Sequence, residues 1–196
     1  MNLQTKITIA APDFSIDYNS KLMMLGSCFA ENMGGKFSYY KFDVDVNPCG
    51  IIYNPLSVAN VLRLIMEGKP FGKDDLRKVG EKWVSLYHHG AFSSTDPEEC
   101  LRRINERLER ATRELRSLDL LVITWGTAWV YKHVGENMVV SNCHKIPSQE
   151  FERSRLSVED IVKEYVELIG RLREINPGLR VLFTVSPIRH WKDGAH

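Results

Sequence analysis

A serine follows the first apolar run of the chain, where a helix is expected to begin. Ser27 comes after Leu22–Leu25 and Gly26, and the residues behind it repeat with helical spacing. Its hydroxyl would lie at the positive end of that helix, close to backbone N–H groups that can stabilise an oxyanion. This position suits a nucleophilic serine. It also suits a simple helix N-cap, which is the commoner use of serine at such a position.

Small and polar residues also follow the other expected strands. Gly50 comes after the second strand, Gly126 and Thr127 follow the third, and His190 follows the fourth. The carboxyl ends of parallel strands meet at one edge of a sheet, where ligands usually bind. We therefore expect Gly50, Thr127 and His190 to lie around one cleft together with Ser27.

A nucleophilic serine needs a base that accepts its proton, and the chain has six histidines. Asp193 and His196 are spaced as D-x-x-H at the end of the sequence. His144 and His190 could bind substrate or brace loops, and the sequence leaves both roles open. His133 is expected in an exposed hairpin. The other two described possibilities concern His88 and His89, which we expect either on an edge strand or in the wall of a site.

The four cysteines are widely and irregularly spaced, and no C-x-x-C pair occurs. Cys28 could be a reactive thiol at a helix N-terminus, but a small buried packing residue is the favoured interpretation. The spacing predicts no metal site, and there is no phosphate-binding loop, so we expect no cofactor. We expect the aromatic residues near strand ends to pack in the core or against loops and not to form a surface that binds carbohydrate. These residues are Trp125, Trp129, Tyr131 and Trp191.

Composition narrows the class of protein. The 196 residues are 43% hydrophobic and 26% charged, which predicts one globular domain over residues 1–196. A formal net charge of +1 without a basic stripe argues against a nucleic-acid partner. No apolar run approaches the roughly 20 residues of a membrane span, and no signal peptide is recognisable. We therefore expect a cytoplasmic protein with reduced cysteines and no membrane contact.

Short apolar runs alternate with amphipathic stretches, which is the pattern of a parallel sheet covered by helices on both faces. Helix starts are marked by capping residues, and Trp83–His89 has strand character. We predict an α/β protein with three α/β/α layers and a mostly parallel, flavodoxin-like sheet. Its expected strands are Met23–Leu25, Val44–Val46, Leu120–Thr124 and Val181–Val185.

Four segments of the chain, taken in order, resemble the GSCFA family. Leu25–Ala30 spells the motif that names the family, and similar blocks follow at Gly126–Tyr131, Asn142–Lys145 and Val185–His190. The family is grouped with the SGNH, or GDSL-like, hydrolases, in which a serine after the first strand attacks esters. The resemblance therefore implies that Ser27 is the nucleophile.

The resemblance also implies roles for residues around that serine. The backbone N–H groups of Cys28 and Gly50 would hold the oxyanion. SGNH enzymes carry an asparagine where this chain has Ala128, so Thr127 or Asn142 would supply the missing donor. The candidate oxyanion or substrate-binding residues are Cys28, Gly50, Gly126, Thr127, Asn142, His144 and His190.

Two hypotheses of function follow. The first is an SGNH-type serine esterase that removes acyl groups from a small or carbohydrate ester, with Ser27, Asp193 and His196 as catalytic residues. The second is a non-catalytic binding or structural protein on the same fold. The second is favoured by Ala128 and by the absence of the aspartate that precedes the serine in the SGNH pattern.

The end of the sequence predicts an incomplete sheet. Only ten residues follow Ser186, and a parallel crossover alone takes about a dozen or more. We expect the chain to be truncated, to lack the last strand of the family's sheet, and to self-associate through an open sheet edge. Either Asp193 and His196 form the acid–base pair, or the pair lies beyond the end of the sequence and the chain is catalytically incomplete.

Overall fold

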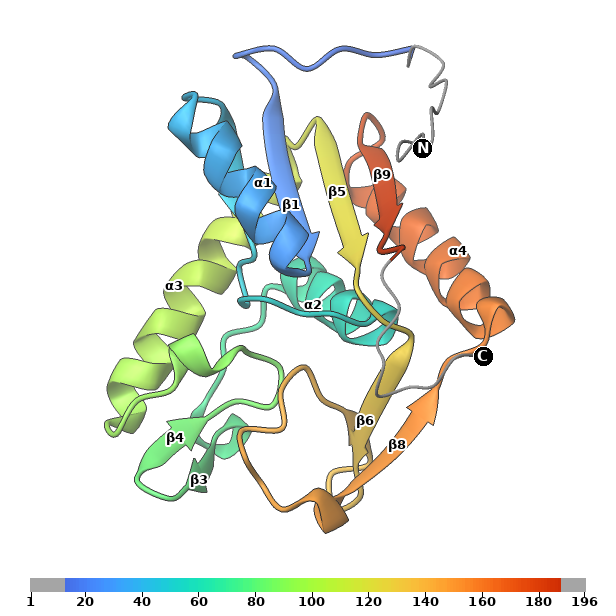
Figure 1. The fold of residues 1–196 in the computed structure, drawn as a ribbon. Helices are drawn as coiled ribbons and strands as arrows, with labels where there is room; N and C mark the ends of the chain where they lie inside the picture. The colour runs from blue at the N-terminus through green and yellow to red at the C-terminus, as the bar shows by residue number, and fades with distance from the viewer. Residues whose placement is uncertain (1–12, 188–196) are drawn as a thin grey trace, which may run out of the picture.

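The computed structural model describes residues 13–187 and centres on a four-stranded parallel sheet (Figure 1). The strands follow the order β2-β1-β5-β9, and each neighbouring pair is parallel. Every predicted strand lies within an observed one, so the predicted sheet is confirmed. The observed bounds are β1 Lys21–Gly26, β2 Asp43–Val46, β5 Leu120–Trp125 and β9 Arg180–Val185.

Each long helix begins at a capping side chain that the sequence displays. The caps are Ser27, Asn54, Asp96 and Ser157, and each accepts a hydrogen bond from a backbone N–H in the first turn. Proline follows two of these caps, where its missing N–H has no helical partner to lose. The helices are α1 Cys28–Tyr39, α2 Pro55–Glu67, α3 Pro97–Leu115 and α4 Val158–Ile175.

The helices form a layer on each face of the sheet. Leu22 and Met24 of β1 pack beneath α1, whereas Met23 and Leu25 join the larger core under α2, α3 and α4. Alternate side chains of a strand point to opposite faces, so one apolar run fills both cores. Figure 1 shows α1 in front of the sheet and the other three helices behind it. The predicted three-layer α/β/α architecture is confirmed.

Two excursions extend past the carboxyl edge of the sheet (Figure 1). Between α2 and α3, β3 (Arg77–Val79) pairs with β4 (Lys82–Val84). Strand character predicted over Trp83–His89 therefore ends at Val84, and the residues after it form turns. Short 3-10 helices lie at Lys73–Asp75, Gly90–Phe92 and Ser148–Glu150.

The second excursion separates β5 from α4. The predicted hairpin is present as β6 (Trp129–His133) and β7 (Met138–Val139), and β6 also pairs with β8 (Phe151–Arg155). β8 was not predicted, because its Glu, Arg and Ser residues lack an apolar alternation. The expectation that His133 is exposed is wrong. It is buried against Phe151, near Arg77 and Glu150.

The order in which strands are added to the sheet reverses at β1. It runs from β1 to β2 on one side and then crosses over to β5 on the other side of β1. The carboxyl ends of β1 and β5 therefore flank the topological switch point, which is where ligands bind in open α/β sheets. No helix in the described range 13–187 is long and apolar enough to cross a membrane.

Candidate functional site

The junction between β1 and α1 lies at the switch point and is built around a glycine. Gly26 has φ +127°, and a side-chain carbon there would lie 2.0 Å from the carbonyl oxygen of Thr124. Only glycine adopts this conformation at this distance without displacing its neighbour. The chain therefore turns tightly out of β1 and brings Ser27 against the end of β5.

Ser27 and Thr124 are joined by three hydrogen bonds. The backbone N–H of Ser27 donates to Thr124 Oγ1 at 2.9 Å and to the Thr124 carbonyl oxygen at 3.2 Å, and the two hydroxyl oxygens lie 3.0 Å apart. Thr124 is 1% exposed, and its hydroxyl has no other acceptor among the described residues. Either hydroxyl can donate across this contact, but Ser27 also lines a cavity whereas Thr124 is enclosed, so we assign the donation to Thr124.

Ser27 Oγ therefore accepts two hydrogen bonds, from Thr124 Oγ1 and from the backbone N–H of Phe29 at 3.3 Å. A hydroxyl oxygen has two acceptor positions and one hydrogen. Because both acceptor positions of Ser27 Oγ are then filled, its hydroxyl hydrogen points away from these two donors, towards the cavity that Ser27 lines. Donors aimed at Oγ also stabilise negative charge on it. The N-cap predicted for Ser27 is thus present, and it is compatible with a nucleophilic role.

A cavity of about 710 Å³ opens in front of this serine. Its wall includes Ser27, Cys28, Phe29, Tyr53, Gly126 and Thr184. Much of the lining is apolar, because Met33 of α1 and Trp125 and Val185 at the strand ends also contribute. The arrangement therefore offers a hydroxyl inside an apolar hollow that an acyl chain would fit.

Asn47 ties the ends of β1 and β2 together, a role that was not predicted. Its Oδ1 accepts the N–H of Gly26 at 2.9 Å, and its Nδ2 donates to Glu31 at 2.8 Å. Its own backbone N–H donates to Met24 at 2.9 Å. Asn47 thus links the turn between β1 and α1 to the end of β2 and to the first turn of α1. An asparagine before proline reads as an ordinary turn residue, so nothing in the sequence marked this role.

Several backbone N–H groups proposed for the oxyanion are already bonded. Gly50 donates to Asn47 O at 2.7 Å. Two features explain why this position is a glycine. Its φ of +82° is left-handed, and an added Cβ would lie only 2.3 Å from the Cβ of His89. Gly126 and Thr127 both donate to Tyr53 O, at 2.8 and 3.1 Å. In the described residues, the N–H of Cys28 at the start of α1 has no acceptor, so it is the best-placed backbone oxyanion donor.

The described histidines brace loops and do not touch Ser27. His144 Nε2 contacts Ser85 O at 2.9 Å, and burial lowers its pKa. Burial likewise lowers the pKa of His88 to about 3, so that ring is neutral in the fold. Its Nδ1 lies 2.9 Å from Ser85 Oγ. His190, Asp193 and His196, the other predicted site residues, lie outside the described residues.

The cysteines differ in burial from what the sequence suggested. Cys28 is exposed on the wall of the Ser27 cavity, so the expectation of a buried packing residue is wrong. Cys49 is buried, and desolvation raises the pKa of its thiol to about 12. In residues 13–187 no three His, Cys, Asp or Glu side chains are grouped as metal ligands.

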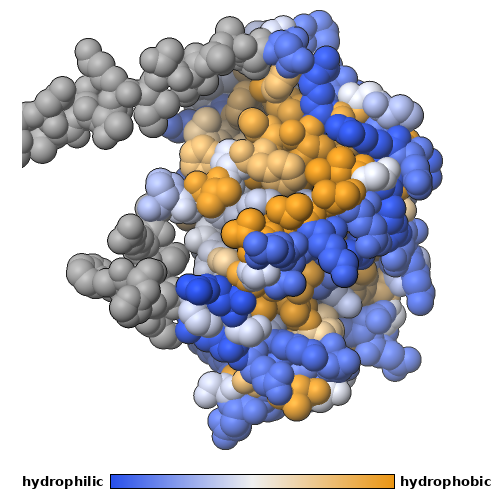
Figure 2. All heavy atoms as spheres, turned by 90° about the vertical axis from the view of Figure 1, so that its right-hand side faces the viewer, coloured by the Kyte–Doolittle hydropathy of each residue, from blue (hydrophilic) through white to orange (hydrophobic). Residues whose placement is uncertain are grey.

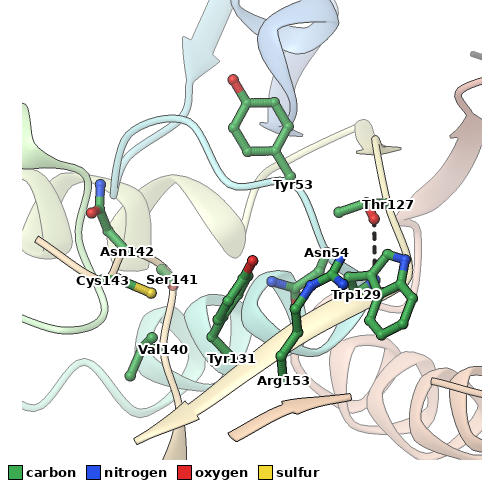
Figure 3. A pocket seen from close by; sticks show the side chains of 10 residues that line it. All are labelled: Tyr53, Asn54, Thr127, Trp129, Tyr131, Val140, Ser141, Asn142, Cys143 and Arg153. Atoms are coloured by element: carbon green, nitrogen blue, oxygen red, sulfur yellow. Dashed lines mark hydrogen bonds between the residues drawn. The ribbon is translucent and has the colours of Figure 1, made fainter. Parts of the chain in front are cut away.

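A second cavity of about 440 Å³ holds the remaining predicted binding residues (Figure 3). Thr127 and Asn142 line it, together with Trp129, Tyr131 and Arg153 from β6 and β8. Tyr53 belongs to the walls of both cavities, so the two lie side by side. Thr127 and Asn142 therefore line the neighbouring cavity and are not among the residues that line the Ser27 cavity, and their role as oxyanion or substrate-binding residues stays a prediction.

The aromatic residues near strand ends serve different purposes. Trp125 packs against Tyr165 and Phe183 in the core, as expected from the sequence. Trp129 and Tyr131 instead form a wall of the second cavity. Their place in the fold separates these residues: Trp125 ends β5 of the main sheet, whereas Trp129 and Tyr131 lie on β6 of the second excursion.

Comparison with known proteins places the chain in a family. A family model described as the GSCFA family matches residues 21–196. The chain belongs to the GSCFA family. No curated protein and no solved structure matches the chain. The GSCFA motif thus occupies the tight turn from β1 into α1, where Gly26 and Ser27 are required by backbone geometry and hydrogen bonding.

Proposed function

We propose that this protein is a serine ester hydrolase of SGNH type, acting through Ser27 on a small or carbohydrate ester. The observation that carries the proposal is that Ser27 Oγ hydrogen-bonds to Thr124 Oγ1 and to the N–H of Phe29, and with Thr124 as the donor the Ser27 hydrogen is left to a base. The apolar cavity beside it would take the acyl chain. The site's place at the topological switch point also favours ligand binding.

The reaction would run through an acyl-enzyme. Ser27 Oγ attacks the ester carbonyl carbon while its proton passes to a base, and the carbonyl oxygen becomes an oxyanion beside the N–H of Cys28. The intermediate collapses, the carbon–oxygen bond to the alcohol breaks, and the alcohol leaves with that proton. Water then releases the carboxylic acid from Ser27. We assign the base to His196, oriented by Asp193, from their D-x-x-H spacing.

A matched pair of N-cap variants tests this proposal. Ser27→Ala and Ser157→Ala each remove a capping hydroxyl and about 0.5–2 kcal/mol of helix stabilisation. Hydrolysis of 4-nitrophenyl acetate and butyrate should fall at least about 1,000-fold in Ser27→Ala and stay near wild type in Ser157→Ala. A fluorophosphonate probe should label Ser27, as located by mass spectrometry.

The alternative function is a non-catalytic binding or structural protein on the same fold. Its support is the bonded state of the N–H groups of Gly50 and Gly126, which reduces the donors available to an oxyanion. If wild-type protein neither hydrolyses the esters nor reacts with the probe, this alternative replaces the hydrolase. If wild-type protein is active, His196→Gln is a further check, since a hydrolase with His196 as its base should lose activity as Ser27→Ala does.

We also propose that two copies associate through β9 and α4. In the described residues β9 pairs only with β5, and Leu182 and Val185 on it are 43% and 70% exposed. Figure 2, which faces this side, shows apolar side chains gathered over a broad area. Val162 and Val166 of α4 are also exposed, at 54% and 69%. Such a surface favours pairing with a partner strand.

The charges along α4 favour a second copy in antiparallel orientation. When two α4 helices cross at Val166, Glu159 meets the partner's Arg173 and Val162 meets the partner's Gly170. Gly170 has open space around it, so a valine can approach closely. The acidic start and the basic end of each helix are thus complementary under a two-fold axis.

A further inference from the structure

The segment that leads into α2 runs beside the turn that carries Ser27 and is fixed to both neighbouring strands. The backbone N–H of Ile52 donates to Gly26 O at 2.8 Å, and the backbone carbonyl of Tyr53 accepts the N–H of Gly126 at 2.8 Å. These two residues therefore bridge the ends of β1 and β5. The bridge leaves the backbone of Tyr53 little freedom.

A helix cap fixes the same segment from its other end. Asn54 is the N-cap of α2, and its buried side chain accepts the N–H of Ser57 at 2.8 Å. Tyr53 thus lies between two neighbours that are held by hydrogen bonds, and its side chain starts from a rigid point of the backbone. A donor on such a rigid segment needs little reorganisation when charge develops near it.

The Tyr53 ring reaches the wall of the Ser27 cavity because residue 126 is a glycine. A Cβ at Gly126 would lie 3.0 Å from Cδ1 of the Tyr53 ring and 3.6 Å from Ser27 Cβ. The ring and the serine therefore flank the space that a side chain at position 126 would fill, and both line the same cavity. Figure 3 shows the Tyr53 ring extending away from Arg153 and Tyr131 of the second cavity.

The Tyr53 hydroxyl is free to donate to a ligand. It has no hydrogen-bond partner within the described residues 13–187, and the residue is 47% exposed. A phenol carries one O–H donor, which can stabilise an oxyanion as a backbone N–H does. A substrate oxygen can thus take this hydrogen bond without breaking one inside the described part of the protein.

The other polar side chains of this cavity wall are farther from the serine or already bonded. Thr184 lies on β9 and Ser186 follows it, and β5 separates that strand from the β1 end where Ser27 lies. Asn32 donates to a backbone carbonyl one turn earlier in α1 at 2.8 Å. Lys36 lies more than two turns from Ser27, about 13 Å along the helix axis. Tyr53 is therefore the polar side chain of the described wall that is placed beside the serine.

The backbone supplies few donors for an oxyanion at this site. The N–H groups of Gly50 and Gly126 are bonded to carbonyl oxygens of the protein, which leaves the N–H of Cys28. The thiol of Cys28 is only a weak donor. Ala128 stands where the SGNH pattern has an asparagine, so a side-chain donor has to come from another position.

We propose that the Tyr53 hydroxyl is the side-chain oxyanion donor of the Ser27 site. Tyr53 has this role only if Ser27 is the nucleophile, so the inference rests on the proposed function. When Ser27 Oγ attacks, the π electron pair of the ester carbonyl moves onto its oxygen, which accepts hydrogen bonds from the Tyr53 O–H and the Cys28 N–H. The pair returns to the carbonyl bond as the alcohol leaves, and the phenol keeps its proton throughout.

Removing the hydroxyl alone tests this role. Tyr53→Phe keeps the ring beside Gly126, and it should unfold at the wild-type temperature because the hydroxyl has no partner in the described residues. With 4-nitrophenyl butyrate, kcat and kcat/KM should both fall by about 100-fold or more, since the lost hydrogen bond forms only in the transition state. Labelling of Ser27 by the fluorophosphonate probe should also slow, because the phosphoryl oxygen takes the place of the oxyanion.

Tyr39→Phe is the matched control, since it removes the hydroxyl of an exposed tyrosine on α1 that lines neither cavity. Its kcat should stay within about twofold of wild type, as expected of a surface change. The role of Tyr53 is overturned if folded Tyr53→Phe keeps the wild-type kcat or raises KM alone. It is also overturned if Thr127→Val or Asn142→Ala lowers kcat more than Tyr53→Phe does.

These outcomes leave the hydrolase standing when wild-type protein is active and labelled at Ser27. Wild-type protein that neither hydrolyses the ester nor reacts with the probe would overturn the hydrolase, and the role of Tyr53 with it. The two failures are therefore told apart by the wild-type protein alone.

Discussion

The side chain of Asn47 accepts a hydrogen bond from the backbone N–H of Gly26, at 2.9 Å and out of contact with solvent. Asn47 directly follows β2, and from there it fixes Gly26, the residue before the candidate nucleophile Ser27. The second bond, from Asn47 Nδ2 to Glu31, fastens the same amide to the first turn of α1. The orientation of Ser27 thus depends on a residue twenty positions away in the sequence.

Asn47→Ala should destabilise the fold by about 1–3 kcal/mol, because the buried N–H of Gly26 loses its acceptor. Asn47 has φ +43°, which itself disfavours alanine. Asn137→Ala is the matched control, since Asn137 has φ +52° but is exposed in a hairpin. Urea unfolding of both variants separates the hydrogen bonds from the backbone strain. Equal losses in the two would show that the Asn47 amide contributes nothing.

Thr124→Val should weaken the reactivity of Ser27 while keeping the shape of the side chain. Valine cannot donate to Oγ, and a hydrogen bond to a charged oxygen is worth about 1.5–3 kcal/mol, or at least about tenfold in rate. Labelling by the fluorophosphonate probe measures the effect. Thr124→Ser keeps the hydroxyl and should restore most of the rate. Unchanged labelling of Thr124→Val would refute the assigned direction of this hydrogen bond.

Adjacent glycines in α1 should respond in opposite directions to alanine. A Cβ at Gly34 would lie 2.4 Å from Val46 Cγ2, whereas a Cβ at Gly35 meets nothing within 4 Å. Gly34→Ala should therefore destabilise the protein by about 1–3 kcal/mol through overpacking. Gly35→Ala should stabilise it by about 0.5–1 kcal/mol through helix propensity. Thermal unfolding of the two variants checks both signs.

Stability should fall as the pH drops below about 6.5, because of His88. Burial lowers the folded-state pKa of His88 to about 3 from an ordinary value of 6.5. Between these values the unfolded chain binds a proton that the folded chain does not, so acid favours unfolding by about 1.4 kcal/mol per pH unit. Above pH 6.5 this contribution is constant. Urea midpoints at pH 7.5, 6 and 5 measure the slope, which should be smaller in His88→Gln; an identical slope would contradict the assignment.

The main sheet could be predicted because its signals are local. Leu120–Ile123 is apolar throughout, as expected of a strand buried on both faces, and Ser157 with Asp160 forms the capping box that opens α4. β8 could not be found this way, since it lies at the surface and its polar residues pair with β6 through the backbone.

The candidate site was predictable only in part, because its support comes from long-range pairs. Ser27 and Gly126 follow strands and were singled out for that reason. Thr124 hydrogen-bonds to Ser27 from 97 positions away, and its side chain reads in the sequence as one more residue of a buried strand. The neutrality of His88 likewise comes from its burial in the fold, which no local pattern displays.

Self-association should depend on the apolar surface of α4 and β9. Leu182→Lys and Val166→Lys each place a charge in the proposed contact, where two copies meet across a two-fold axis and the charges repel. Sedimentation velocity should show wild-type protein approaching twice its 22.5 kDa chain mass as concentration rises, and both variants remaining near one chain mass. Tyr39→Lys, at a 77% exposed position on α1, is the control and should associate like wild type.

A charge reversal tests the orientation of the two α4 helices. Glu159→Arg should weaken the dimer, and adding Arg173→Glu should restore it, because the double variant has the same ion pair with its charges exchanged. A wild-type protein that stays monomeric over this range would rule out the two-fold contact.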